Sequence, residues 1–296
     1  MSLKESSFAG IKYHKEFDKL NTQIENCFLS EPGPGVIPEK RDNNEETKGV
    51  IVPCDNYDIS GFCTAWAYKK IAETSFRDVY IIIGHTDSGK SGILLEDIET
   101  PLGVLKTDIN LGNELHNLTN ISTDKNLFQE NYCIESQLPF LQYSSRDKLN
   151  ILRVLCIALG KDISYEQIVI LANSIKKILK NANKKATYIC STNLVSFGKM
   201  FNYTPFAYNI KESVEDVDYH IIELISSKKP RELIDFVIKE ETTVYGYNAI
   251  ALFLELVKES SENKMLEYYQ SDIFKKNRDN RDEEVSFTSY ASFEFK

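Results

Sequence analysis

Short apolar segments alternate with amphipathic helical segments through most of this 296-residue chain. The segment 48–53 is β-branched and apolar, and the segment 60–73 carries apolar residues at helical spacing after a serine suited to cap a helix. The further strands expected are 78–84, 148–159 and 185–192, and the further helices expected are 162–181, 213–227, 230–240 and 246–260. Strands that alternate with helices pair in parallel, and the helices cover both faces of the sheet. The sequence therefore predicts an α/β fold, a three-layer αβα sandwich around a mostly parallel or mixed sheet.

The two ends of the chain are predicted to complete a single domain of residues 1–296. A helix is expected over 16–29, and an exposed loop over 31–48 contains three prolines, two glycines and a run of charges. Two strands, 264–270 and 284–294, are expected at edges of the sheet.

Charge and composition exclude several classes of protein. The formal net charge of −9 disfavours attraction to nucleic acid. No apolar run reaches the roughly 18 to 20 residues of a membrane span, and MSLKESSFAG lacks the apolar core of a secretory signal. The six cysteines, Cys27, Cys54, Cys63, Cys133, Cys156 and Cys190, include no C-x-x-C pair. We expect a cytoplasmic protein in which all six are free thiols.

Loops that follow the parallel strands are the expected place for a ligand. In open α/β sheets, ligands bind outside the carboxyl ends of the strands. Here those ends carry residues 54–57, 84–87 and 192–193. If the protein has a site, these loops form its floor.

Residues 84–91, GHTDSGKS, match the pattern G-x-x-x-x-G-K-[ST] of phosphate-binding loops. In that interpretation Lys90 would reach the nucleotide phosphates and Ser91 would hold Mg²⁺. A phosphate loop needs a long helix beginning near the lysine, whereas Pro101 and Gly103 interrupt the segment that follows. Nucleotide binding is therefore only a second alternative function.

Several separate segments match, in chain order, the motifs of one known family. KESSFAGIKYHKEFDKLNTQIENCFL corresponds to R-E-x-x-x-A-G-x-W-Y and its helix, VPCDNYDISGFCTAWAYK to P-H-A-G-Y-x-Y-S-G-x-x-A-A-x-A-Y, IIIGHTD to G-P-[SN]-H, and ETPLGVLKTD to T-P-L-G-x-x-x-x-D. IESQLPFLQ corresponds to H-S-[IL]-E-x-Q-L-P-[FY]-L, ICSTNLVSFG to S-S-D-F-x-H-x-G, TTVYGYNAIALFLEL to T-x-C-G-x-x-[PA]-I, and VSFTSYASFEF to V-S-Y-A-S. Over nearly its whole length the chain resembles the Memo family.

The resemblance implies a fold and a range of functions. Members have an α/β fold similar to that of the class III extradiol ring-cleaving dioxygenases. They resemble adaptor or signalling components that take part in cell motility and recognise phosphotyrosine peptides in the strand-end cleft. A protein or phosphopeptide partner is therefore expected here, although a carboxylate at one histidine position disfavours a phosphate.

The resemblance also implies where a metal would be held. The family ligands, two histidines and a cysteine, correspond to Cys54, Asp87 and Tyr245. Other polar cleft positions correspond to Tyr132, Asn193 and Ser196, and the histidine of an N-terminal A-H-A-G motif corresponds to Phe8. Because each of these positions differs from the family residue, we expect a pseudoenzyme with no catalytic residue and no cofactor, which acts by binding.

A residual metal-dependent redox enzyme is the first alternative. Cys54, His85 and Asp87 offer a thiolate, an imidazole and a carboxylate, which would suit zinc, iron or copper. Tyr245 is a poor ligand because a phenol with a pKa near 10 must lose its proton to bind a metal strongly. Cys54 could also act as a nucleophile, but Asp55 beside it would raise the pKa of the thiol.

Overall fold

The computed structural model of the protein describes residues 3–271, 273–276 and 283–296. Its strands are β1 (Leu3–Lys4), β2 (Gly49–Val52), β3 (Val79–Thr86), β4 (Gly92–Ile93), β5 (Asp97–Thr100), β6 (Gly103–Thr107), β7 (Arg153–Gly160), β8 (Ala186–Ser191), β9 (Ser196–Phe197), β10 (Asn263–Gln270), β11 (Ile273–Lys276) and β12 (Glu283–Phe295). Its α-helices are α1 (Phe17–Leu29), α2 (Tyr57–Glu73), α3 (Ile109–Thr119), α4 (Tyr132–Glu135), α5 (Gln137–Ser144), α6 (Tyr165–Asn181), α7 (Ile210–Ser226), α8 (Pro230–Lys239) and α9 (Tyr247–Leu256). Short 3₁₀ turns cover Lys125–Phe128, Leu149–Ile151 and Lys199–Phe201.

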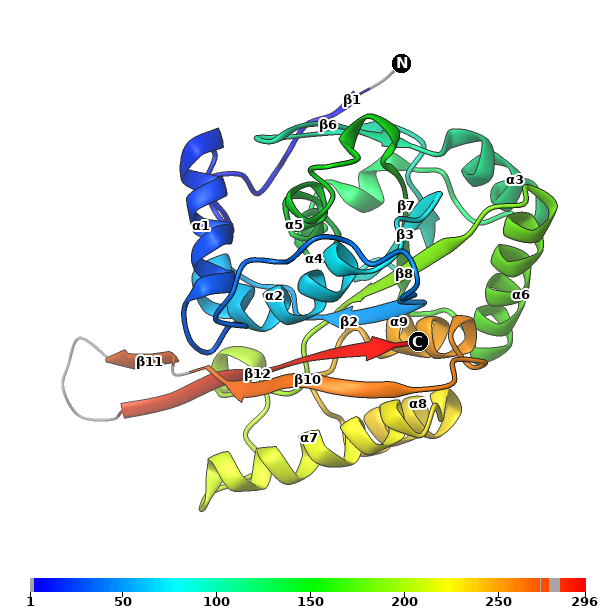
Figure 1. Cartoon of the computed structure of the whole chain (residues 1–296). Helices are drawn as coiled ribbons and strands as arrows, with labels where there is room; N and C mark the ends of the chain where they lie inside the picture. Colours follow the sequence, from blue (N-terminus) through cyan, green and yellow to red (C-terminus); the bar gives the residue numbers. More distant parts are fainter. Residues whose placement is uncertain (1–2, 272, 277–282) are drawn as a thin grey trace.

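The strands form one mixed sheet with helices on both faces (Figure 1). Over the described residues the main order is β1-β5-β6-β7-β3-β8-β2-β12-β10. The central pairs β6–β7, β7–β3, β3–β8 and β8–β2 are parallel, whereas β12 runs antiparallel to both β2 and β10. The predicted αβα architecture and mixed sheet are confirmed.

Alternation along the central strands divides the interior into two cores. In β3, Ile81 and Ile83 pack on one face with side chains from α3, α6, α7, α8 and α9. Tyr80 and Ile82 point to the other face and pack with side chains from α1, α2 and α5. A strand that is buried on both sides has to be apolar at every position, which is why these segments read as continuous apolar runs.

All six expected helices form, with shifted ends. Helix α2 begins at Tyr57 rather than at residue 60, because Asn56 is its N-cap and accepts a hydrogen bond from the backbone N–H of Asp58. Helix α6 begins after Ser164, whose side chain and that of Gln167 form a reciprocal capping box.

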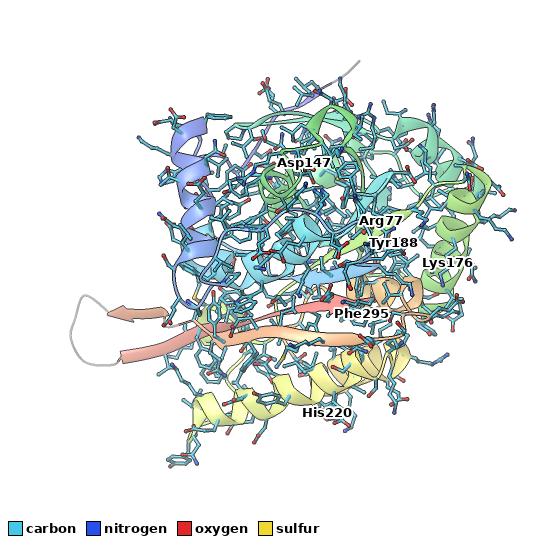
Figure 2. All side chains as sticks on the ribbon, viewed as in Figure 1. Arg77, Asp147, Lys176, Tyr188, His220 and Phe295 are labelled. Atoms are coloured by element: carbon cyan, nitrogen blue, oxygen red, sulfur yellow. A yellow bond between two sulfur atoms is a disulfide. The ribbon has the colours of Figure 1, made fainter. Side chains whose placement is uncertain are left out.

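Two strand predictions are wrong in part. The expected strand 148–159 begins only at Arg153, because Leu149–Ile151 form a 3₁₀ turn in which Leu149 and Ile151 are exposed. The C-terminal strand is not at an edge: β12 lies between β2 and β10. The burial of β12 fits this central position, since Phe293 and Phe295 are fully buried. Phe295, labelled in Figure 2, packs edge-on against Phe253 of α9.

Local sequence patterns did not predict β4, β5, β6 or α3, which lie between β3 and β7. This stretch holds β4, β5 and β6, the helix α3, and the consecutive short helices α4 and α5.

In the described part of the chain, no helix is both long and apolar enough to cross a membrane.

A carboxyl group is buried where α7 meets the sheet. Asp218 is fully buried; its Oδ1 accepts a hydrogen bond from the Val195 backbone N–H at 3.0 Å, and its Oδ2 accepts one from the Tyr268 hydroxyl at 3.0 Å. Burial raises the pKa of this carboxyl to about 7, against its hydrogen bonds, which lower it. The folded protein therefore favours the neutral acid.

This burial predicts a pH dependence of stability. The folded pKa lies above the unfolded one, so the stability contributed by the neutral Asp218 is complete below about pH 4 and is lost as the pH rises towards about 7. The neutral Asp218→Asn variant should therefore gain stability relative to wild type across this window, by about 1.4 kcal/mol per unit of pKa shift. Urea unfolding at a series of pH values measures it. Asp216→Asn, at an exposed position of the same helix, is the control; identical pH profiles for the two variants would contradict the prediction.

Candidate functional site

The carboxyl ends of three neighbouring strands meet at one edge of the sheet. Cys54 follows β2, Asn193 follows β8, and β3 ends at Thr86 immediately before Asp87. These are the loops in which the sequence places a ligand site. Helix α4 lies over the end of β3, and a Cβ on Gly84 would come within 2.7 Å of Ile134 Cγ1. The glycine therefore permits this close packing of α4 on the strand.

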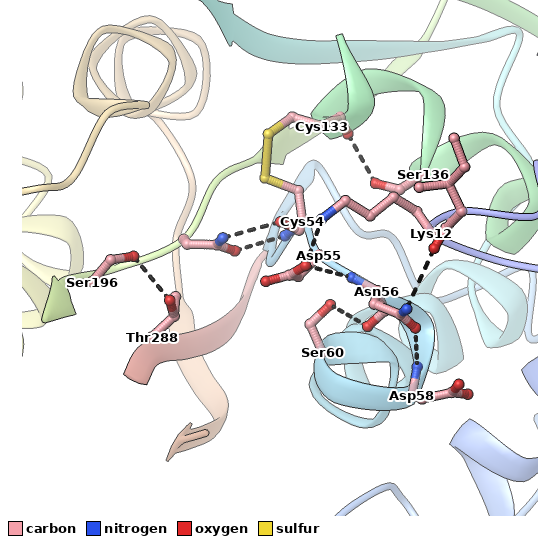
Figure 3. A network of polar contacts seen from close by, with 12 residues as sticks. Lys12, Cys54, Asp55, Asn56, Asp58, Ser60, Cys133, Ser136, Ser196 and Thr288 are labelled. Carbon is pink, nitrogen blue, oxygen red and sulfur yellow. Dashed lines mark hydrogen bonds and ion pairs between the residues drawn. A yellow bond between two sulfur atoms is a disulfide. The ribbon is translucent and has the colours of Figure 1, made fainter. Parts of the chain in front are cut away.

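A disulfide bond joins Cys54 to Cys133 across this edge (Figure 3). The two residues are 79 positions apart in the chain, and their Cα atoms are 4.8 Å apart, within the usual range for a disulfide. The prediction of six free thiols is therefore wrong for this pair. It is confirmed for the others, which are buried free cysteines: Cys27, Cys63, Cys156 and Cys190.

A buried glutamine organises the backbone around the disulfide. The Gln137 Nε2 donates to the Pro53 carbonyl at 3.0 Å and to the Ser191 hydroxyl at 2.8 Å. The Ser191 hydroxyl in turn donates to the Cys133 carbonyl at 2.6 Å. One side chain thus links the ends of β2 and β8 to the start of α4.

The side chains of Asn193 and Ser196 form hydrogen bonds with other groups of the protein. The Asn193 amide makes two hydrogen bonds with the Cys54 backbone, accepting from its N–H at 2.8 Å and donating to its carbonyl at 3.0 Å. Ser196 is buried, and its hydroxyl lies 3.0 Å from that of Thr288 (Figure 3). Neither side chain is therefore presented to a ligand.

A lysine takes part in the cleft from the N-terminal segment. The Lys12 ammonium forms an ion pair of 2.8 Å with Asp55 (Figure 3). It also lies 4.7 Å from the centre of the Tyr132 ring. Asp55 also accepts a hydrogen bond from the Tyr290 hydroxyl at 2.9 Å. The positive charge of Lys12 thus compensates the negative charge of Asp55, the residue next to Cys54.

Asp87 and Tyr132 line one cavity, and Tyr245 lies near Tyr132 but is not part of that lining. Burial raises the pKa of both the Tyr132 and Tyr245 hydroxyls, that of Tyr132 to about 12; Asp55 and then Asp87 add to the shift of Tyr132, and Asp87 adds to that of Tyr245. Burial lowers the pKa of His85, against the opposing effect of Asp87. At neutral pH the cleft therefore presents neutral phenols and a neutral imidazole beside an exposed carboxylate.

The space next to these groups is a cavity of about 280 Å³. Of the predicted cleft residues, its lining includes only Asp87 and Tyr132. The full lining comes from the end of β3 and the segment before and at the start of α4: His85, Thr86, Asp87, Ser88, Asn126, Leu127, Gln129, Glu130, Asn131, Tyr132 and Cys133. Asp87 and Glu130 are exposed acidic residues, and the lining contains no lysine or arginine. The cavity is polar and acidic.

The N-terminal segment is fixed above the cleft by one carboxylate. Glu135 is buried, and its Oε1 accepts hydrogen bonds from the Phe8 N–H at 2.7 Å and the Tyr13 hydroxyl at 2.8 Å. Its Oε2 accepts from the Ser7 N–H at 2.9 Å and from the Lys4 ammonium at 3.0 Å. The Phe8 ring, positioned in this way, packs edge-on against Tyr132 with a centroid distance of 5.9 Å.

The residues present do not fit a metal ion. Cys54 has no thiolate to offer while it is bonded to Cys133, and Tyr245 is more than half exposed with a raised pKa. Among the residues that the structure describes, no three or more His, Cys, Asp and Glu side chains form a group suited to a metal. The candidate set Cys54, His85 and Asp87 is therefore not assembled as a donor set.

The phosphate-loop match adopts a different local structure. Strand β4 follows Ser91, and no helix begins near Lys90 to direct its N-terminus at an anion. The Ser91 hydroxyl accepts a hydrogen bond from the Gly160 backbone N–H at 3.0 Å. This environment lacks the helix terminus on which nucleotide binding by Lys90 and Ser91 would depend.

The sequence matches a known family over almost its whole length. A family model described as "Memo-like protein" matches residues 4–291. The chain belongs to this Memo-like family. A "MEMO1 family protein" of Methanobrevibacter smithii is 30% identical over 268 residues, which cover 88% of this chain and 89% of the relative. Another from Thermotoga neapolitana is 29% identical over 261 residues, covering 86% and 88%.

A solved structure supports the fold of this Memo-like protein. An uncharacterized protein of Escherichia coli K12, JW3007, aligns with a TM-score of 0.50 and 10% sequence identity. The alignment covers 85% of this chain and 100% of that one. The likeness concerns the arrangement of helices and strands only.

Two residues of the cleft were missed by sequence reasoning, Cys133 and Lys12. Cys133 is adjacent to Tyr132, which the resemblance places in the cleft, so the same correspondence could have suggested a partner for Cys54. Lys12 stands at the tryptophan of the family motif R-E-x-x-x-A-G-x-W-Y. A cation where the motif has an aromatic residue was the available signal.

The role of Glu135 can be tested by removing its carboxylate. Glu135→Ala leaves Lys4 and the backbone N–H of Phe8 without their buried acceptor, so we expect a loss of about 2–4 kcal/mol of unfolding free energy. Trypsin should then cleave faster after Lys4 and Lys12. Urea unfolding and timed proteolysis are the measurements. Glu130→Ala, at an exposed position in the same region, should change stability by at most about 0.5 kcal/mol. Unchanged cleavage in Glu135→Ala would refute the role.

Proposed function

We propose that this Memo-like protein is non-catalytic and acts by binding a polypeptide at the strand-end cleft. The proposal rests on the observation that several polar and sulfur-containing side chains of the cleft are bonded to other groups of the protein. Cys54 is bonded to Cys133, the Asn193 amide is bonded to the Cys54 backbone, and the Ser196 hydroxyl lies against Thr288. While these contacts are in place the side chains are not available to coordinate a metal, and Cys54 offers no thiolate as long as its disulfide is intact.

The remaining groups suit recognition of a protein segment. Tyr132 lines the cavity and Tyr245 is more than half exposed, and tyrosine is enriched in protein interfaces because it adds large contact area at low entropic cost. The acidic lining, with Asp87 and Glu130, favours a basic or neutral side chain over a phosphate. The proposed ligand is therefore a peptide segment with a basic side chain, and the proposed role is that of an adaptor in signalling.

A peptide array tests this ligand class. Full-length protein incubated with arrayed basic, neutral and phosphotyrosine peptides should select the basic ones. Affinity for the selected peptides should fall at least about tenfold, or about 1.4 kcal/mol, in Tyr132→Ala and Asp87→Asn. Tyr208→Ala, at a highly exposed tyrosine outside the cavity lining, is the matched control. Preferential binding of phosphotyrosine peptides, or selection that ignores Tyr132 and Asp87, would contradict the proposal.

Metal analysis tests the non-catalytic part. Protein purified without chelator or metal-affinity tag, with its disulfide intact, should contain far less than one equivalent of zinc, iron or copper by mass spectrometry. The expectation follows from the donor set, in which Cys54 is not a thiolate. One equivalent of metal that is lost in Cys54→Ala or Asp87→Ala would instead establish an altered metal site and a residual enzyme.

A further inference from the structure

We propose that Cys54 and Cys133 form a reversible dithiol–disulfide centre that exchanges electrons with a thiol reductant entering through the 280 Å³ cavity. This inference does not depend on the proposed peptide binding. It follows from where the pair lies, from how its backbone is held, and from the raised pKa values of the other described thiols.

The two cysteines are held together by contacts that do not involve sulfur. The Cys54 backbone is fixed by the Asn193 amide through two hydrogen bonds. The Cys133 carbonyl accepts hydrogen bonds from Ser191 at 2.6 Å and from Ser136 at 3.3 Å. Breaking the disulfide leaves these anchors intact, so the thiols remain adjacent and can bond again. A disulfide that only stapled two mobile segments would lose this proximity on reduction.

The remaining described thiols are unsuited to exchange. Burial raises the pKa of Cys27 and Cys156 to about 12 and also raises that of Cys63 and Cys190. Because the thiolate is the reactive form, these raised pKa values disfavour thiol exchange at the four groups. None of the four lines the cavity next to Cys133.

The cavity indicates which sulfur is attacked. Both cysteines are almost completely buried, but Cys133 belongs to the cavity lining and Cys54 does not. A thiolate of the reductant attacks Cys133 Sγ, the bond to Cys54 breaks, and the Cys54 thiolate leaves with the electron pair and takes a proton from solvent. A second reductant thiolate then attacks the reductant sulfur of this mixed disulfide, which frees Cys133 as a thiolate that is also protonated. Two electrons pass from a dithiol, or from two monothiols, which leave as a disulfide.

The charge of the lining sets a preference among reductants. Asp87 and Glu130 are exposed there without a lysine or arginine in the lining. An acidic cavity repels an anionic thiol and attracts a cationic one. Cysteamine should therefore reduce the disulfide several-fold faster than glutathione at equal thiolate concentration, and added salt should diminish the difference.

A redox titration of the full-length wild-type protein tests the centre. Samples equilibrated with different ratios of reduced and oxidised dithiothreitol are alkylated without denaturant and mapped by mass spectrometry. We expect Cys54 and Cys133 to titrate together as a single two-electron couple, reversibly, while the other cysteines are alkylated only after unfolding. Cys63→Ala, which removes a buried thiol outside the pair, should titrate identically. Thiols at Cys54 and Cys133 that persist in excess oxidant, or a disulfide that yields only in denaturant, would overturn the proposal.

Single-cysteine variants test the order of attack. With glutathione disulfide, Cys54→Ser should accumulate at least about ten times more glutathione adduct, on Cys133, than wild type, in which Cys54 resolves the mixed disulfide. Cys133→Ser should form adduct on Cys54 much more slowly than Cys54→Ser does on Cys133. Equal rates in the two variants, or glutathione matching cysteamine at low salt, would exclude entry through the cavity.

Discussion

The cleft depends on the hydrogen bonds of one buried amide. Gln137 connects the end of β2, through the Pro53 carbonyl, to the end of β8, through Ser191, and Ser191 extends the connection to the first turn of α4. In a buried environment each of these polar groups would cost about 1–3 kcal/mol if left unpaired. The strand ends and α4 are therefore held in one arrangement, and that arrangement brings Cys133 to Cys54.

Two carboxylates near the cleft, those of Glu135 and Asp55, are paired with groups of the N-terminal segment. Glu135 holds the backbone of Ser7 and Phe8, and Lys12 reaches down to Asp55 and the Tyr132 ring. The segment thus lies against the cleft residue Tyr132 through Phe8 and Lys12. The two proposals, peptide recognition and thiol exchange, both concern this edge of the Memo-like scaffold.

The local pattern of apolar residues predicted the central strands well. It failed where the structure of a segment depends on its exposure to solvent and not on its hydropathy. The strand expected at 148–159 includes Leu149 and Ile151, which are apolar but lie exposed in a 3₁₀ turn. The segment 284–294 was expected at an edge, yet β12 pairs with both β2 and β10. Neither the exposure of the turn nor the position of β12 in the sheet can be predicted from a short stretch of sequence, because each depends on which distant strand lies beside the segment. Of the residues that the resemblance places in the cleft, Asp87 and Tyr132 line one cavity and Tyr245 lies near Tyr132, but Ser196 proved to be buried.

The sequence by itself determined the αβα class, the Memo-like family and the strand-end loops that form the cleft, because these follow from local patterns and ordered motifs. Tertiary structure alone decided the chemistry there. Cys54 and Cys133 are separated by 79 residues, and only the parallel order β3–β8–β2, with α4 packed over β3, brings their Cα atoms to 4.8 Å. The position of Lys12 and the burial of Asp218 have the same origin. Such pairings depend on the register of distant segments, which a chain acquires only when it folds.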